Sequence, residues 1–223
     1  MAIALIGSGG LSADVGEKAR AGLHIQRVPK QGNWYAYSGF TGTIGAALAA
    51  NSELLQFRFL SGTKTKAEVH SVSVDGVGPV AVATAAGPMG FALFPARAWT
   101  VAGSGGTRIA VSGDNLQMET DAPNSQANDL GIATTGALTA GTKTLDANAQ
   151  GQVIFGVGTG AVTVAQRLSL IDPVVLLNSE RRGGMPLSLA NQEGFVIRTT
   201  HAGVAALTYV VGFTVVWCEV AAT

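Results

Sequence analysis

The densest group of charged side chains in the sequence is the run Glu180-Arg181-Arg182. Arginine binds carboxylates through paired hydrogen bonds and is enriched where proteins dock, so the run fits a docking point. It also fits a solvated loop tip, where exposed charges add little stability, and charge runs of this kind are more often of that sort. Trp34-Tyr35 is a close aromatic pair that fits either a sugar-stacking platform or a packed loop anchor. Trp34, Tyr35, Glu180, Arg181 and Arg182 are therefore the candidate interface residues.

The sequence does not show the spacing of a catalytic or metal site. His24, His70 and His201 are scattered, and no Asp or Glu lies near them at the sequence spacing of a catalytic or metal site. We therefore interpret His70 and His201 as strand or strand-end side chains. Gly103–Gly106 and Gly156–Gly160 resemble pieces of phosphate loops, but strand-like residues follow both, and phosphate binding needs a helix there. We predict no catalytic residue, no cofactor and no metal, and a protein that is not an enzyme.

The composition excludes several classes of partner. In 223 residues, 14 Lys and Arg balance 14 Asp and Glu, and charged residues make up only 13%. The chain has neither the basic surface that binds nucleic acid nor the run of about 20 apolar residues that spans a membrane. Cys218 is its only cysteine, which excludes an intramolecular disulfide. A neutral, charge-poor chain is poorly soluble alone, which favours an assembly subunit.

Short strands separated by turns dominate the chain after residue 50. The clearest strand carries on one face the alternate residues Tyr209, Val211, Phe213, Val215 and Trp217. About ten such strands, many glycine turns and no amphipathic helix favour an all-β, jelly-roll-like antiparallel β-sandwich over a parallel α/β fold. Residues 1–50 lack this pattern. We therefore predict an irregular N-terminal extension or arm over residues 1–50 and a β-sandwich domain over residues 51–223.

Two local patterns predict features of one long apolar stretch. Val69 and Val72 fall on opposite parities of a strand, which predicts a bulge near His70 and Ser71. Asp75-Gly76 is a tight-turn sequence and predicts a hairpin at that point.

Further expectations concern two prolines and two stretches of the chain. Pro95 is expected to end the strand that starts at Phe91. Pro173 interrupts the apolar stretch Ile171–Leu177, which suits either a strand at a sheet edge or a crossing segment. Ile44–Leu55 fits either one short helix or an extended lead-in strand. Leu187–Phe195 is interpreted as two strands around a polar turn, pairing with the terminal strand to close a sheet.

Four segments of the sequence resemble segments of a known group of proteins. They are Phe40–Ile44 through Leu55–Phe59, Phe91–Thr100, Gly184–Arg198 and Val211–Val220. Together they resemble virion structural proteins of tailed bacteriophages, over roughly Ser38 to Thr223. The members of that group are β-sandwich, often jelly-roll, subunits that decorate or cement the head shell, and their pattern carries no catalytic residues. Cys218 and the charged insert Ser179–Arg182 depart from the pattern.

The resemblance implies a capsid decoration or cement protein that binds across major capsid subunits and stabilises the head shell. It implies a homotrimer on the capsid surface of the virion, made in the host cytoplasm. The resemblance does not cover the N-terminal extension, which is our own candidate for an element that is swapped between subunits or grips the capsid. One alternative is a tail, baseplate or fibre-base subunit of the same virion. A second alternative is a carbohydrate-binding β-sandwich module.

Overall fold

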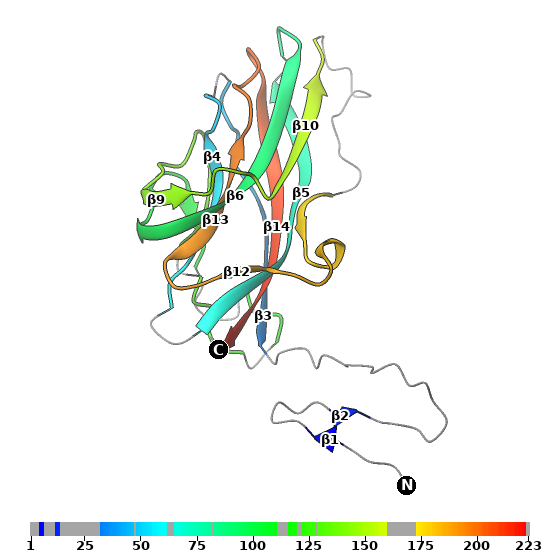
Figure 1. The fold of residues 1–223 in the computed structure, drawn as a ribbon. Helices are drawn as coiled ribbons and strands as arrows, with labels where there is room; N and C mark the ends of the chain where they lie inside the picture. Colours follow the sequence, from blue (N-terminus) through cyan, green and yellow to red (C-terminus); the bar gives the residue numbers. More distant parts are fainter. Residues whose placement is uncertain are drawn as a thin grey trace, which may run out of the picture. The chain divides into compact units, whose positions relative to one another are not determined.

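The chain divides into two units, Met1–Gly32 and Asn33–Thr223. The structure is a computed structural model, which describes residues 5–6, 12–13, 32–46, 48–61, 65–81, 83–110, 116–119, 122–127, 129–159 and 173–221. In the first unit, β1 (Leu5–Ile6) pairs with β2 (Ser12–Ala13) in antiparallel orientation. All the other described strands belong to the second unit (Figure 1).

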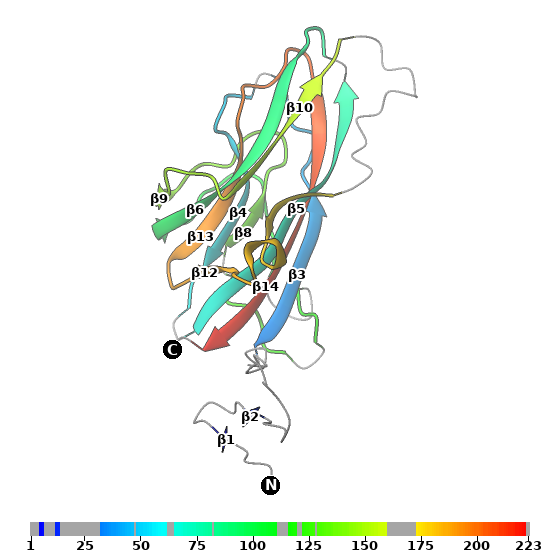
Figure 2. The ribbon, with the colours of Figure 1, turned by 45° about the vertical axis from the view of Figure 1, so that its right-hand side comes forward.

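The second unit is a sandwich of two antiparallel sheets (Figures 1 and 2). The seven-stranded sheet runs in the order β10 (Gly151–Val157), β6 (Gly87–Val101), β13 (Glu193–Thr199), β4 (Glu53–Phe59), β8 (Asp129–Ile132) and β7 (Thr107–Arg108), with β9 (Thr142–Leu145) also on β6. The five-stranded sheet runs in the order β11 (Val174–Asn178), β5 (Thr65–Ala81), β14 (Thr208–Ala221) and β3 (Asn33–Phe40), with β12 (Leu187–Leu189) also on β5. The prediction of an all-β, jelly-roll-like antiparallel sandwich is confirmed.

The terminal strand β14 lies between β5 and β3 at the centre of the five-stranded sheet. Its predicted core face is confirmed, because five alternate side chains are buried against the other sheet: Tyr209, Val211, Phe213, Val215 and Trp217. Strand β14 is paired on both edges, with β5 from Thr208 to Ala221 and with β3 from Gly212 to Glu219.

Aromatic rings join the two sheets. The ring of Phe57 on β4 meets the ring of Trp217 on β14 edge-on, with centroids 5.0 Å apart. Phe195 stacks on Phe57 within one sheet at 5.0 Å, and Tyr35 stacks on Trp217 within the other at 5.6 Å. Offset and edge-to-face contacts of this kind add about 1 kcal/mol each beyond the area they bury. These four rings fix the spacing of the sheets near one end of the core.

The long strand β5 confirms one local prediction and contradicts another. Val69 pairs with Trp217 while Ser71 pairs with Val216, so His70 is an extra residue and the predicted bulge is confirmed. The predicted hairpin at Asp75-Gly76 is wrong, because β5 continues through it to Ala81. Asp75 forms a second bulge instead, and its carboxylate accepts hydrogen bonds from side chains of both β5 and β14. Pairing with β14 along its length keeps this turn sequence extended.

Pro95 does not end its strand, contrary to the prediction. Strand β6 runs through it, and Pro95 pairs with Phe195 of β13. On the opposite edge of β6, β10 stops at Leu93 and β9 starts at Ala96. On that edge Pro95 thus lies in the gap between β10 and β9, so no hydrogen bond between strands is lost through its missing N–H.

The two strands around the polar turn after Leu187 do not pair with the terminal strand, so that prediction is also wrong. Strand β12 joins β5, and β13 lies between β4 and β6 in the other sheet. The turn therefore carries the chain from one sheet to the other. Of the two alternatives for the segment around Pro173, the structure shows the sheet edge, since β11 is the outermost strand beside β5.

The sandwich begins at Asn33, before the boundary at residue 51 that the sequence favoured. Asn33–Phe40 forms β3, which runs along β14 as a full strand (Figure 2). Beyond it, Ile44 forms a single bridge to Tyr209, and β4 starts at Glu53. The stretch that fitted either a helix or a lead-in strand is thus extended or turn-like in its described residues.

A buried carboxylate closes one end of the core. Glu219 is 8% exposed, and its Oε1 accepts hydrogen bonds from Ser125 Oγ at 2.6 Å, from the backbone N–H of Gln126 at 2.9 Å and from Trp217 Nε1 at 3.3 Å. Burial raises the pKa of Glu219, against the effect of these hydrogen bonds. Beside it, the Tyr35 hydroxyl donates to the carbonyl of Pro123 at 2.8 Å, and burial raises the pKa of Tyr35 to about 12. Both groups tie the loop before β8 to the core.

We expect Glu219→Gln to remove a pH dependence of stability. A carboxyl group whose folded-state pKa is raised favours folding at low pH, and that contribution is lost as pH rises from about 4.5 through the raised pKa. Glu219→Gln keeps the accepting oxygen without the charge, so the variant should be at least as stable as wild type at pH 7.

The matched variant Glu219→Ala leaves three buried donors unpaired and should lower the free energy of unfolding by about 2–3 kcal/mol. Urea denaturation between pH 4 and 8 measures both effects. Equal pH dependence of wild type and Glu219→Gln would contradict the interpretation.

Candidate functional site

The structure separates the aromatic pair that the sequence suggested. Neighbouring residues of a strand face opposite sides, so Tyr35 is buried in the core while Trp34 lies on the outer face of the five-stranded sheet. There the Trp34 ring packs against His70, with centroids 4.7 Å apart. Of the pair, only Trp34 is available at the surface.

The charged run forms an exposed turn, which we call the 180–185 turn. Glu180–Arg182 is one short 3-10 helix between β11 and β12 (Figure 1). Every residue from Glu180 to Met185 is exposed. Gly183 and Gly184 have φ angles of 67° and 80°. Glycine adopts this left-handed conformation without strain because it has no Cβ atom. Met185, at 66% exposed, follows the two arginines on the surface.

The 180–185 turn is attached to the bulge in β5. Ser179, at its root, donates its amide to the His70 carbonyl at 2.8 Å, and Ser179 Oγ lies 3.1 Å from His70 Nδ1. At its tip, Arg182 Nη2 donates to Gln150 Oε1 at 2.8 Å, beside the first residue of β10. His70 therefore contacts both Trp34 and the root of the turn, which brings the candidate interface residues, except Tyr35, into one region.

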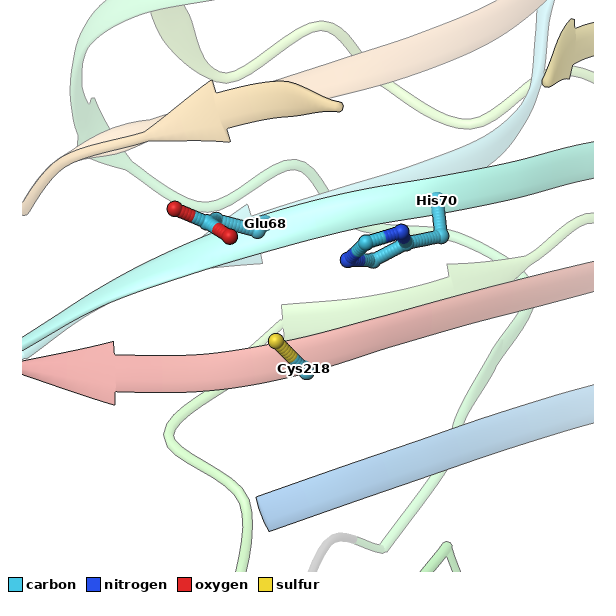
Figure 3. Close-up of side chains that lie close together, drawn as sticks. All are labelled: Glu68, His70 and Cys218. Atoms are coloured by element: carbon cyan, nitrogen blue, oxygen red, sulfur yellow. The ribbon is translucent and has the colours of Figure 1, made fainter. Parts of the chain in front are cut away.

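A carboxylate, an imidazole and a thiol lie together beside this region (Figure 3). Glu68 and His70 come from β5 and Cys218 from β14, and their ligand atoms all lie within 4.8 Å of one another. Lys66 Nζ pairs with Glu68 Oε1 at 3.1 Å. Burial lowers the pKa of His70, while the nearby Glu68 opposes that effect.

The sequence interpretation missed this cluster. Glu68 and His70 are two residues apart on a strand, a spacing that places them on one face and could have drawn attention. Cys218 lies opposite Glu68 only because of the register between β5 and β14. His201 lies next to Thr200, whose hydroxyl is 2.8 Å from its Nδ1, and His24 lies outside the described residues. Within the described part of the chain, Glu68, His70 and Cys218 are the one group of three that could hold a metal ion.

A second polar cluster is buried on the outer side of the seven-stranded sheet. Glu53 Oε2 accepts from Lys143 Nζ at 2.9 Å and from Gln56 Nε2 at 2.6 Å. The side chain of Lys143 is 2% exposed, and its Nζ lies 4.4 Å from the centroid of the Trp99 ring. Burial lowers the pKa of Lys143, against the raising effect of Glu53. Each charge is matched at short range, so we interpret the cluster as structural.

The glycine-rich segments do not form phosphate loops where the structure describes them. Gly103–Gly106 is the connection between β6 and β7, with Gly105 and Gly106 at positive φ. Gly156 and Val157 lie within β10, while Gly160 lies outside the described residues. In neither segment do the described residues show a helix that could present amide groups to a phosphate.

No protein-family model and no curated protein matches this chain. The resemblance to phage virion proteins therefore rests on the sequence segments that carry it. Of the residues placed in the structure, none belongs to a helix long and apolar enough to cross a bilayer.

We expect Lys143→Met to destabilise the protein by about 3–5 kcal/mol, because it leaves the Glu53 carboxylate buried without its cation. The double variant Glu53→Gln/Lys143→Met buries no uncompensated charge and should recover most of that loss. Urea denaturation at pH 7 measures all three proteins. An unchanged midpoint for Lys143→Met would show that the Glu53 carboxylate is solvated rather than buried.

Proposed function

We propose that this protein is a non-catalytic decoration or cement subunit on the head of a tailed bacteriophage. It binds across neighbouring major capsid subunits and thereby stabilises the shell. The sequence resemblance suggests this role, and the jelly-roll-like sandwich is compatible with it. The observation that carries the proposal is the 180–185 turn, an anchored projection whose side chains suit docking.

Composition and anchoring together favour the 180–185 turn as the docking element. Arginine and methionine are both enriched in protein interfaces, and here Arg181, Arg182 and Met185 are exposed within five residues. Five other large apolar side chains of the described residues are exposed at separate places in the sequence, and individual exposed apolar residues are ordinary for a protein surface: Phe40, Val80, Val101, Met118 and Ile154. The attachment of Ser179 to His70 reduces the conformational freedom that the turn loses on binding.

Stabilisation of the shell follows from mass action. A protein that binds only the assembled subunits lowers the free energy of that state, and the effect grows with the bound fraction. A homotrimer presents three copies of the turn at once, so three weak contacts combine into tight attachment. The interface requires no bond-making chemistry and no cofactor.

The position of the protein in the particle separates the proposal from its alternatives. Gold-labelled antibodies against the protein should decorate the heads of the virions that contain it. Labelling of tails or baseplates would favour the second role in the virion. Binding to a glycan array without any virion labelling would favour a carbohydrate-binding module and contradict the proposal.

Replacing both arginines of the turn with alanine should weaken attachment to purified heads at least about tenfold, because arginines at the centre of an interface carry a large share of its energy. Thr142→Ala/Thr144→Ala, on exposed positions of β9, is the matched control and should bind normally. Co-sedimentation with heads measures attachment. Light scattering should give three times the 22.6 kDa of one chain for all three proteins, so that lost binding is not lost assembly. Unchanged attachment of the arginine variant would reject the turn as the docking point.

The N-terminal unit is the proposed arm that grips the capsid or a neighbouring subunit. A deletion that tests it must end at residue 32, because removing residues 1–37 would also remove most of β3. The protein lacking residues 1–32 should keep the urea midpoint of the sandwich while losing much of its attachment to heads. If attachment stays unchanged, the arm has no role in it.

A further inference from the structure

The outer face of the five-stranded sheet brings three kinds of metal-binding side chain to one place (Figure 3). Glu68 and His70 lie on β5, and Cys218 on β14 is the direct partner of Glu68. Their ligand atoms all lie within 4.8 Å of one another. We propose that Glu68, His70 and Cys218 bind a transition-metal dication of the Zn²⁺ class.

His70 is oriented as a metal ligand requires. Its Nδ1 lies at hydrogen-bond distance from Ser179 Oγ, and its Nε2 is buried without a hydrogen-bond partner among the described residues. When Nδ1 carries the proton, the lone pair of Nε2 is available, which is how proteins commonly orient metal-binding histidines. Burial lowers the pKa of His70, which favours the neutral ring that coordinates metals.

Glu68 and Cys218 supply the other two donors. Lys66 pairs with Glu68 through Oε1, which steadies the carboxylate while its second oxygen is not part of that ion pair. The thiol of Cys218 lies 3% exposed beneath Glu68 and His70, both of which are partly exposed. The charge of a bound metal favours the thiolate, so coordination releases the thiol proton to solvent.

The donor set selects the class of metal. A thiolate, an imidazole and a carboxylate are the ligands of Zn²⁺, whereas Ca²⁺ and Mg²⁺ take oxygen donors. Ligand atoms of a tetrahedral zinc site lie about 3.5 Å from one another. The ligand atoms of Glu68, His70 and Cys218 therefore need to move up to about 1 Å closer together to bind the metal. Three protein ligands leave the fourth position for water or another donor.

A metal at this position would connect separate parts of the sandwich. It would join β5 to β14 and, through His70 and Ser179, steady the root of the 180–185 turn. Because the three ligands come together only in the folded chain, binding stabilises the fold by mass action. The site rests on its own contacts and is independent of the proposed function in the virion.

Cobalt(II) is the probe, because a bond from thiolate to cobalt(II) gives a near-ultraviolet charge-transfer band. We expect titration of the full-length, reduced protein to produce this band and to saturate at one equivalent. Excess zinc should remove the band by displacing cobalt. Absence of the band at about tenfold excess of cobalt would overturn the proposal.

Variants identify the ligands. Cys218→Ser should abolish the band, and Glu68→Gln should weaken cobalt binding at least about tenfold. His70→Asn should weaken it likewise while keeping a side-chain nitrogen near Ser179, which protects the fold. His201→Ala is the matched histidine control and should titrate like wild type. Full affinity in both Glu68→Gln and His70→Asn would show a lone thiol binding cobalt and would refute the three-ligand site.

Thermal unfolding gives a second measurement. Zinc at about one hundred times its dissociation constant should raise the midpoint of wild type by about 5–10 °C and that of Cys218→Ser not at all. Equal circular dichroism spectra without metal confirm that the variant folds. A wild-type midpoint that zinc leaves unchanged counts against the site.

Discussion

The contact of Phe57 with Trp217 holds the two sheets at a fixed distance, and much of the fold depends on it. Trp217 meets Phe57 of the other sheet edge-on and stacks on Tyr35 within its own sheet. Two residues further along β14, Glu219 accepts a hydrogen bond from the Trp217 indole and ties down the loop before β8. A close-packed core tolerates little change in volume. The register of β14 against β3 and β5 is therefore set by its buried face.

That register decides what the opposite face of the sheet presents. Val69 and Val72 must both reach the core although they fall on opposite parities, and the bulge at His70 allows it. The extra residue lies on the outer face, where it contacts Trp34 and the root of the 180–185 turn. A packing requirement inside the sandwich thus places an imidazole next to Cys218 outside it.

Charged residues are few in this chain, and the buried ones have different surroundings from those on the exposed 180–185 turn. The buried carboxylate of Glu53 and the buried ammonium of Lys143 pair at short range, because an unmatched buried charge is expensive. The buried carboxyl group of Glu219 has three hydrogen-bond donors around it instead. The exposed arginines of the 180–185 turn have no such internal role, apart from one hydrogen bond between Arg182 and Gln150. In a chain with so few charges, two adjacent arginines on an anchored projection are the feature most suited to a partner.

Alternation of apolar residues is a local property, so the sequence alone determined the β-sandwich class, the core face of β14 and the bulge at His70. It also revealed the charged run at Glu180. Strand pairing joins residues far apart in the chain, so it cannot be predicted from any one segment. Only the tertiary structure therefore decided that Asp75-Gly76 stays extended and that Pro95 lies within β6, in the gap between β10 and β9. The same long-range register brought Cys218 to Glu68 and His70, about 150 residues away.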